Sequence, residues 1–168
     1  MTSTTAPCIV WLKRDLRLTD HAPLVAASGR PAILLYIVEP ELWRQPDLSA
    51  RQYGFLAECL AELRADLGAL ALRLVIRSGD AVAVLEELRA RSGARALLSH
   101  QETGNLWSYA RDRRVARWAR AQGVQWTEFR QSGVERPAPD RDGWARRWER
   151  FMRHPIASAP PPIDCSTG

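Results

Sequence analysis

The feature that most constrains this chain is an unbroken apolar run from Ala32 to Val38. A strand that is apolar on both sides must be covered on both sides, which is typical of a central strand in a parallel sheet. Four other apolar segments of strand length occur along the chain, and stretches with helical periodicity separate them. This alternation predicts an α/β fold in which a doubly wound, five-stranded parallel sheet carries helices on both faces.

The pattern puts the strands at residues 8–12, 32–38, 72–77, 96–100 and 124–129. Helices are expected at residues 21–27, 50–67 and 106–122, and between Asp80 and Gly93. Helix 50–67 should bury one stripe of side chains, at Tyr53, Leu56, Leu60, Leu63 and Leu67. Asp20 and Asp80 are the expected N-caps of the helices that follow them, and the segment between Pro40 and Pro46 is expected to be a loop. The expected strand order is 3-2-1-4-5, numbered along the chain.

Composition limits the class of protein. Of the 168 residues, 46% are hydrophobic and 26% are charged, as in ordinary globular domains. No segment approaches the roughly 20 apolar residues of a membrane helix. Residues 1–7 lack the basic start and apolar core of a signal peptide, and the three cysteines match no zinc or redox spacing. We therefore expect a reduced, cytoplasmic protein with no membrane partner.

The regular pattern ends after Phe129. Residues 130–143 hold two prolines and two glycines, as surface loops do, and a short helix is expected at residues 144–153. Three consecutive prolines at 160–162 have the composition of an extended linker. We expect residues 1–135 to form the α/β domain and residues 136–168 to form a loop, a short helix and a linker toward a second domain.

The sequence carries no common catalytic signature, neither a glycine-rich phosphate loop nor a nucleophile elbow. Its three histidines lie far apart, so they do not suggest a metal cluster, although His100 at a strand end has a candidate functional position. In a doubly wound sheet, ligands bind beyond the carboxyl ends of the strands where the strand order reverses. Here that crevice lies between the first and fourth strands, whose following loops, 13–17 and 100–105, are rich in polar groups. Alternatively, Arg14, Asp15 and Arg17 form an ion-pair network that only shapes the turn.

One segment resembles a known family. Residues 11–20, Trp-Leu-Lys-Arg-Asp-Leu-Arg-Leu-Thr-Asp, are similar to the opening of DNA photolyases and cryptochromes, where Trp-Phe-Arg-x-Asp-Leu-Arg-x-x-Asp follows the first strand. Leu12 and Lys13 depart from that pattern. Residues 35–40, 78–80, 109–112 and 144–152 resemble later segments of the same family, so the resemblance covers about residues 8–154.

The resemblance implies an N-terminal α/β domain that often holds an antenna pigment, followed by a helical domain that binds FAD. In such a full-length protein, blue light drives the splitting of pyrimidine dimers, so the whole protein would be a deoxyribodipyrimidine photolyase or a cryptochrome. Its partners would be its own C-terminal FAD domain and damaged DNA. This chain resembles only the N-terminal part and is not expected to be catalytic alone. Trp11, Trp126, Trp144 and Trp148 are expected to pack rather than to carry electrons.

The same resemblance assigns antenna-binding residues. They would be Lys13, Arg14, Tyr36, Glu39, Gln101 and Glu102. In folate-binding members an Asn-Glu pair stands just before the Ala-Arg-Asp segment, but Trp107 and Ser108 occupy those positions here. This departure disfavours folate and leaves a flavin-like or deazaflavin antenna, or an empty pocket.

Charge is unevenly distributed. Residues 100–154 carry twelve arginines against seven acidic residues, so the net charge of +5 lies in the second half. Arg113 and Arg117 lie on one face of helix 106–122, and we hypothesise that they contact DNA phosphates. The alternative is a solvated face with Asp112 and Glu149 as local partners.

Two other function classes stay open at this point. One is a stand-alone nucleotide-binding α/β domain of the universal-stress or electron-transfer-flavoprotein type. The other is an arginine-rich module that binds DNA or a protein partner.

Overall fold

The predicted sheet is present. A computed structural model describes residues 6–134, 142–158 and 163. Its five strands are all parallel and lie in the order β3-β2-β1-β4-β5, which confirms the expected topology. The strands are β1 Cys8–Leu12, β2 Ala32–Val38, β3 Leu74–Ser78, β4 Ala96–His100 and β5 Gln125–Phe129. The third and fifth strands therefore begin two and one residues later than expected.

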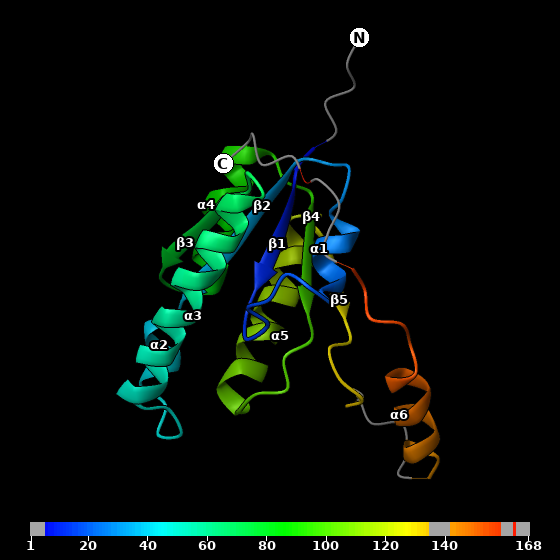
Figure 1. Cartoon of the computed structure of the whole chain (residues 1–168). Coiled ribbons are helices and arrows are strands. Elements are labelled where there is room, and N and C mark those ends of the chain that lie inside the picture. The colour runs from blue at the N-terminus through cyan, green and yellow to red at the C-terminus, as the bar shows by residue number, and fades with distance from the viewer. Residues whose placement is uncertain (1–5, 135–141, 159–162, 164–168) are drawn as a thin grey trace.

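Strand β1 lies at the centre of the sheet, and every residue of Cys8–Leu12 is buried. It pairs with β2 along its whole length, from Cys8 opposite Ala32 to Leu12 opposite Tyr36, and with β4 on its other side. Figure 1 shows that all the strand arrows point toward the same edge of the sheet. The loops after β1, β2 and β4 therefore meet at that carboxyl edge.

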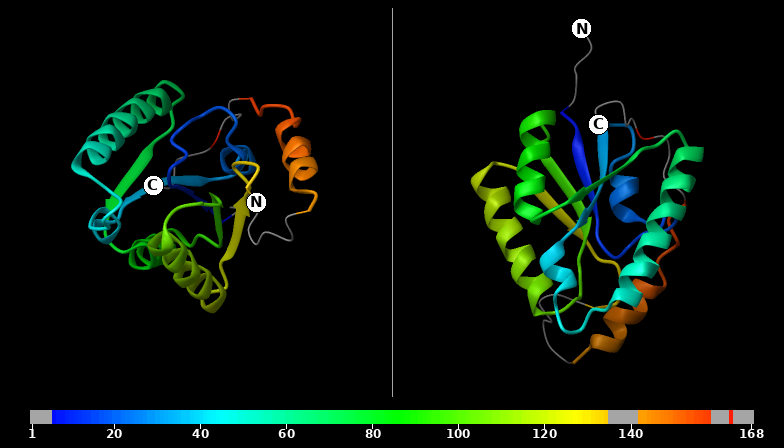
Figure 2. Two further views of the ribbon diagram at one scale, coloured as in Figure 1. Left: turned by 90° about the horizontal axis from the view of Figure 1, so that it is seen from below. Right: turned by 90° about the vertical axis from the view of Figure 1, so that its left-hand side faces the viewer.

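Helices cover both faces of the sheet. The helices are α1 Ala22–Ala26, α2 Pro40–Trp43, α3 Ala50–Ala69, α4 Ala81–Ser92, α5 Leu106–Ala121 and α6 Trp144–Met152. One core lies between the sheet and helices α1 and α3, through residues such as Leu24, Leu63 and Leu67. The second core lies between the opposite face and helices α4 and α5, through residues such as Leu85 and Val115. The view from below in Figure 2 shows α3 and α5 on opposite sides of the strands.

The expected N-cap of α1 is wrong by one residue. His21 caps this helix, because its Nδ1 accepts a hydrogen bond from the Leu24 N–H. Asp20 instead has a φ of 52° and binds the C-terminal segment: its N–H donates to the Ala157 carbonyl and its Oδ1 accepts from the Ala157 N–H. The other expected cap, Asp80, accepts from the N–H groups of Val82 and Ala83 as predicted.

Two expectations about packing need correction. The segment expected to be a loop contains the short helix α2, whose first residue is Pro40, a favoured position for proline. Tyr53 was expected in the buried stripe of α3, but it is 45% exposed and contacts the ring of Trp43 edge-on. The buried stripe of α3 begins at Leu60.

Helix α6 stands apart from the sheet in Figure 1. Trp144 and Trp148 were expected to pack, and they stack on each other with ring centroids 6.2 Å apart, although both stay about half exposed. Arg130 lies over the ring of Phe151 on the same helix. Beyond α6, Ile163 is buried in the core beside α1 and α3, and the prolines at 160–162 lie outside the described residues. Within the described residues, none of the helices is long and apolar enough to cross a membrane.

Candidate ligand-binding site

A cavity of about 400 Å³ opens at the carboxyl edge of the sheet. Its floor comes from the ends of β1 and β2, and its roof from α2, the connection to α3 and the first half of α3. The walls combine aromatic and aliphatic side chains with a charged side, and they include Trp11, Leu16, Tyr36, Trp43, Leu48, Phe55 and Leu56. Pockets of this size and largely apolar lining typically hold small molecules or cofactors.

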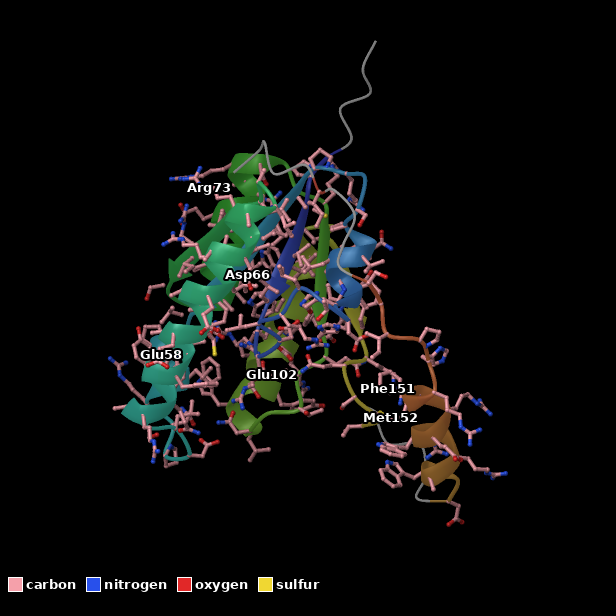
Figure 3. All side chains as sticks on the ribbon, in the orientation of Figure 1. Glu58, Asp66, Arg73, Glu102, Phe151 and Met152 are labelled. Atoms are coloured by element: carbon pink, nitrogen blue, oxygen red, sulfur yellow. The ribbon has the colours of Figure 1, made fainter. Side chains whose placement is uncertain are left out.

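Five of the six candidate antenna residues line this cavity: Lys13, Arg14, Tyr36, Glu39 and Glu102. Glu102 is labelled in Figure 3, where it lies near the carboxyl edge of the sheet. Gln101 does not line the cavity but lines two other pockets on the β4 side of the edge. The cavity therefore lies mainly on the β1–β2 side of the edge, and a smaller pocket of about 140 Å³ lies between the loops after the first and fourth strands, where the crevice was expected.

Arg111 lies at the switch point, where its guanidinium meets acidic groups from the end of β2, the loop after β4 and α5. It forms ion pairs with Glu39, Glu102 and Asp112, and its side chain is only 3% exposed. The guanidinium also lies 4.8 Å from the centroid of the Trp11 ring. One arginine thus ties the end of β2, the loop after β4 and helix α5 together around the central strand.

Burial and charge act in opposite directions on this network. Burial disfavours the Arg111 cation, but attraction to Glu39, Asp112 and Glu102 outweighs it and raises the pKa of Arg111 above its usual value. Burial raises the pKa of Glu39 to about 7, although Arg111 counteracts the rise. Burial also raises the pKa of Tyr36, and the nearby carboxylates of Glu39 and Glu102 raise it further. Tyr36 therefore presents a neutral hydroxyl in the cavity wall.

The charge of Lys13 points away from the cavity. Its ammonium lies 3.3 Å from Asp112 and 3.6 Å from Glu128, and 4.5 Å from the centroid of the Trp11 ring. Asp112 is therefore a buried partner of Lys13 and Arg111 and not a local partner of a solvated face, whereas Glu149 does pair locally with Arg153. Lys13 contributes its aliphatic stem to the cavity wall and its charge to the switch-point network.

Three buried polar atoms of residues that line the cavity make no hydrogen bond among the described residues. They are the carboxylate Oε1 of Glu39, the indole Nε1 of Trp43 and the carboxylate Oε1 of Glu102. The second oxygen of Glu39 is held by Arg111, whereas both oxygens of Glu102 face arginines, with Arg14 Nε 2.9 Å from Oε1. A buried polar atom without a hydrogen bond costs folding free energy. These atoms have almost no accessible surface, so they add to the cost of burial at the cavity wall.

A second buried cluster lies beside the loop after β1. Asp15 Oδ2 is 2.6 Å from His100 Nδ1 and 2.8 Å from His21 Nε2, and its Oδ1 accepts from the Lys13 N–H. Burial opposes the Asp15 charge, but the hydrogen bonds from His100 and His21 hold the pKa of Asp15 well below its usual range. Burial lowers the pKa of His21 despite the nearby carboxylate.

The sequence did not suggest that these groups meet. His21 and His100 are neighbours in space, with ring centroids 4.5 Å apart. Among the described residues, Asp15, His21 and His100 form the group whose ligand atoms lie close enough together to suit a metal ion. The hydrogen bonds to Asp15 and the capping role of His21 give the cluster a structural role at the base of the loop. Asp15 therefore shapes the turn, as the alternative interpretation predicted, but through histidines, whereas Arg17 binds the Asp20 carbonyl.

Sequence reasoning also missed Arg111 as a site residue. A signal was present, since Ser108, Arg111, Val115 and Trp118 follow a three/four spacing and all are buried on one face of α5. An arginine in such a stripe has its charge inside the protein, where it needs acidic partners.

The hypothesised DNA-contacting residues lie elsewhere. Arg113 and Arg117 are exposed on the outer face of α5, with Arg114 and Arg120 beside them. Arg114 forms an ion pair with Asp80, whereas no acidic partner of Arg113 or Arg117 occurs among the described residues. The structure therefore leaves these two charges available to solvent.

Comparison with known proteins identifies the family. The family model described as DNA photolyase matches residues 8–139, which is most of the chain. The chain belongs to the DNA photolyase family. A deoxyribodipyrimidine photo-lyase of Agrobacterium fabrum is 41% identical over 96 residues, and Cryptochrome DASH of Arabidopsis thaliana is 38% identical over 103 residues. Each match covers 56% of this chain, but only 19% and 18% of the respective relative.

Solved structures agree with this assignment. A bacterial class III photolyase from Agrobacterium tumefaciens superimposes with a TM-score of 0.81 and 27% identity, over 98% of this chain and 36% of that photolyase. An archaeal photolyase from Sulfolobus tokodaii, described with two FAD molecules, has the same fold, with a TM-score of 0.77 at 20% identity over 96% of this chain and 39% of its own. The matches favour this photolyase-family domain over the stand-alone nucleotide-binding domain and the interaction module.

Proposed function

We propose that this chain is the light-harvesting antenna domain of a blue-light-dependent photolyase or cryptochrome, and that the cavity under α2 and α3 holds a planar flavin-like or deazaflavin pigment. The observation that carries the proposal is the cavity itself, at the carboxyl edge of a photolyase-family sheet, with aromatic walls and a charged side. When bound, such a pigment would supply absorption of near-ultraviolet or blue light. Trp11, Tyr36 and Trp43 would pack against its ring.

The length of the relatives extends the proposal to a larger protein. They are several times longer than the segment that this chain matches. We infer that the activity of the whole protein, splitting pyrimidine dimers or signalling light, requires a C-terminal FAD domain and damaged DNA as partners. Arg113 and Arg117 would help to position the duplex through its phosphates. We also propose that the protein acts in the cytoplasm, which a fluorescent fusion in cells can test.

The direct test of the antenna proposal is a ligand titration of the purified 168-residue chain. FMN and lumiflavin, which has the same ring without ribityl phosphate, are titrated while flavin fluorescence is followed. We expect saturable binding and strong quenching, because the buried Trp11 and the Tyr36 hydroxyl line the cavity.

A pair of variants locates the binding. Cys59→Phe places a bulky ring in the cavity wall, whereas Ala61→Phe adds the same bulk to the exposed face of the same helix. Cys59→Phe should weaken binding by about tenfold or more, which is about 1.4 kcal/mol, and Ala61→Phe should have little effect. Absence of flavin binding to the unaltered chain, or equal binding by both variants, would refute the proposal.

A further inference from the structure

A second hollow lies between α5 and β5, away from the proposed antenna cavity. Its volume is about 720 Å³, and we call it the α5–β5 groove. Its α5 wall includes Leu106, Tyr109, Arg113 and Ala116, and its β5 wall includes Trp126 and Glu128. The α5 residues recur every three or four positions, so they form one stripe along the helix. Because β5 is an edge strand, the groove lies at the outer side of the sheet, where Figure 2 shows α5 beside β5.

Aromatic and apolar surface is exposed in this groove. Tyr109 is 49% exposed and Leu106 is 88% exposed, and the partly buried ring of Trp126 lines the same groove. Trp126 is held in place, because its indole N–H donates to Ser99 Oγ at 3.0 Å and its ring centroid lies 6.3 Å from that of Trp11. Exposed and fixed aromatic rings in one groove are suited to stacking against a flat ligand.

The positive charges of the α5 wall are available to a ligand. Arg113 lines the groove, Arg117 follows one turn later, and neither has an acidic partner within the described part of the chain. By contrast, the carboxylates that line the groove each form an ion pair with a lysine or an arginine; they are Glu102, Asp112 and Glu128. The α5 wall therefore attracts an anion such as a phosphate, whereas the acidic groups nearby are already matched.

The length of this stripe favours a chain of nucleotides over a free nucleotide. Tyr109 and Arg117 lie about two turns apart, which is about 12 Å along the helix axis. A ligand that reaches the ring and both arginines must therefore carry several phosphates. Proteins bind single strands with aromatic rings that stack on the bases and with positive grooves that follow the phosphates. In a duplex the neighbouring bases cover both faces of a base, so only an unpaired base can stack on the groove.

We propose that the α5–β5 groove binds single-stranded DNA, with one base stacked on the Tyr109 ring and the neighbouring phosphates at Arg113 and Arg117. This inference rests on the proposed DNA contacts of the two arginines. It goes beyond them by assigning an aromatic site for an unpaired base, outside the antenna cavity. Recognition does not depend on the base sequence, because every base offers a face for stacking.

The test compares two fluorescently labelled strands that carry the same number of phosphates. One is a thymidine oligonucleotide of about 12 nucleotides, within the usual site size of single-strand binding proteins, and the other is an abasic strand of the same length. Fluorescence anisotropy measures the affinity of the purified 168-residue chain for each strand at several salt concentrations. We expect the thymidine strand to bind about tenfold more tightly, because only its bases can stack on Tyr109.

Three variants separate stacking from charge. Tyr109→Leu keeps an apolar side chain but removes the ring, so the preference for the thymidine strand should fall below about threefold with an unchanged salt slope. Tyr53→Leu removes a similarly exposed ring from α3, on the opposite side of the sheet, and should keep the full preference. Arg113→Gln should weaken the binding of both strands alike and reduce the salt slope by about 0.7, the value for one phosphate of a single strand.

The outcomes distinguish base stacking from the phosphate contacts on which it rests. If the two strands bind the unaltered chain equally, the stacking site is refuted, and the salt slope of Arg113→Gln still tests the phosphate contact. The stacking site is also wrong if the preference persists in Tyr109→Leu, or if Tyr53→Leu loses it to the same extent. If neither the single strands nor a duplex bind the chain, both the groove and the proposed arginine contacts fail.

Discussion

Replacement of Arg111 by methionine tests the buried charge network directly. Methionine matches the unbranched stem of arginine but carries no charge, so Glu39, Glu102 and Asp112 would lose their shared cation. Removal of one partner from a buried ion pair typically costs about 3–5 kcal/mol. Because Arg111 is 3% exposed and contacts three carboxylates, we expect the upper part of this range.

Such a loss is large on the scale of a domain, whose total stability is typically about 5–15 kcal/mol. For a chain of this size it corresponds to a decrease of about 10 °C in the midpoint of thermal unfolding. The measurement is urea unfolding followed by circular dichroism. The cost of Arg111→Met should be smaller at pH 5 than at pH 8, because Glu39 can then take up a proton and no longer needs a cation.

The matched control is Arg91→Met on α4. Arg91 forms a surface ion pair with Glu87 at 3.2 Å, and its side chain is 71% exposed. Exposed pairs contribute about 0–1 kcal/mol, so this variant should be nearly neutral. The reasoning about the switch point is refuted if Arg111→Met costs less than about 1 kcal/mol, or no more than the control.

The titrating groups and the arginine face lead to three further predictions. Between its ordinary pKa of 4.5 and the raised value of about 7, Glu39 holds a proton in the folded protein that the unfolded chain has released. The free energy of unfolding should therefore fall as the pH rises through this window, and it should fall less in Glu39→Gln. Urea unfolding at pH 5 and pH 8 measures the difference. The pKa of His21 is lowered, so stability should fall as pH drops below 6.5; His21→Asn, which still caps α1, should flatten that part of a thermal-shift pH profile. Joint replacement of Arg113 and Arg117 by alanine should weaken binding to undamaged duplex DNA. The slope of log affinity against log salt concentration should fall by about 0.9 for each phosphate that is no longer neutralised. An unchanged affinity and slope at two salt concentrations would make this face purely structural.

The fold could be predicted because its signal is local. The apolar composition of the run from Ala32 to Val38, and of the neighbouring strands, is enough to predict that they are buried. The order of the strands in a doubly wound sheet then follows from few rules. The bounds that were missed, such as the short helix at Pro40, depend on contacts with α3 over the cavity. Exposure of Trp144 and Trp148 was not predictable either, because an aromatic side chain is buried only where a neighbouring surface covers it.

The candidate site could be predicted only in part, for a related reason. Lys13, Arg14, Glu39 and Glu102 follow strand ends that converge, and Tyr36 lies in the last residues of β2, so topology brings them together. Their roles depend on pairings between residues far apart in the sequence, such as Lys13 with Asp112 on α5. The sequence does not show whether a charged residue will face a ligand or another buried charge.

The buried charge network also has a consequence for the order of events in folding. Arg111 can meet Glu39 and Glu102 only after β1, β2, β4 and α5 have assembled, because each ion pair joins segments from different elements. Charges lose their hydration at the end of that assembly, so these ion pairs should be largely absent from the transition state. Interactions of that kind slow unfolding and have little effect on the folding rate. These ion pairs would then set the lifetime of the folded domain, through a slower rate of unfolding, and leave the rate at which the sheet forms almost unchanged.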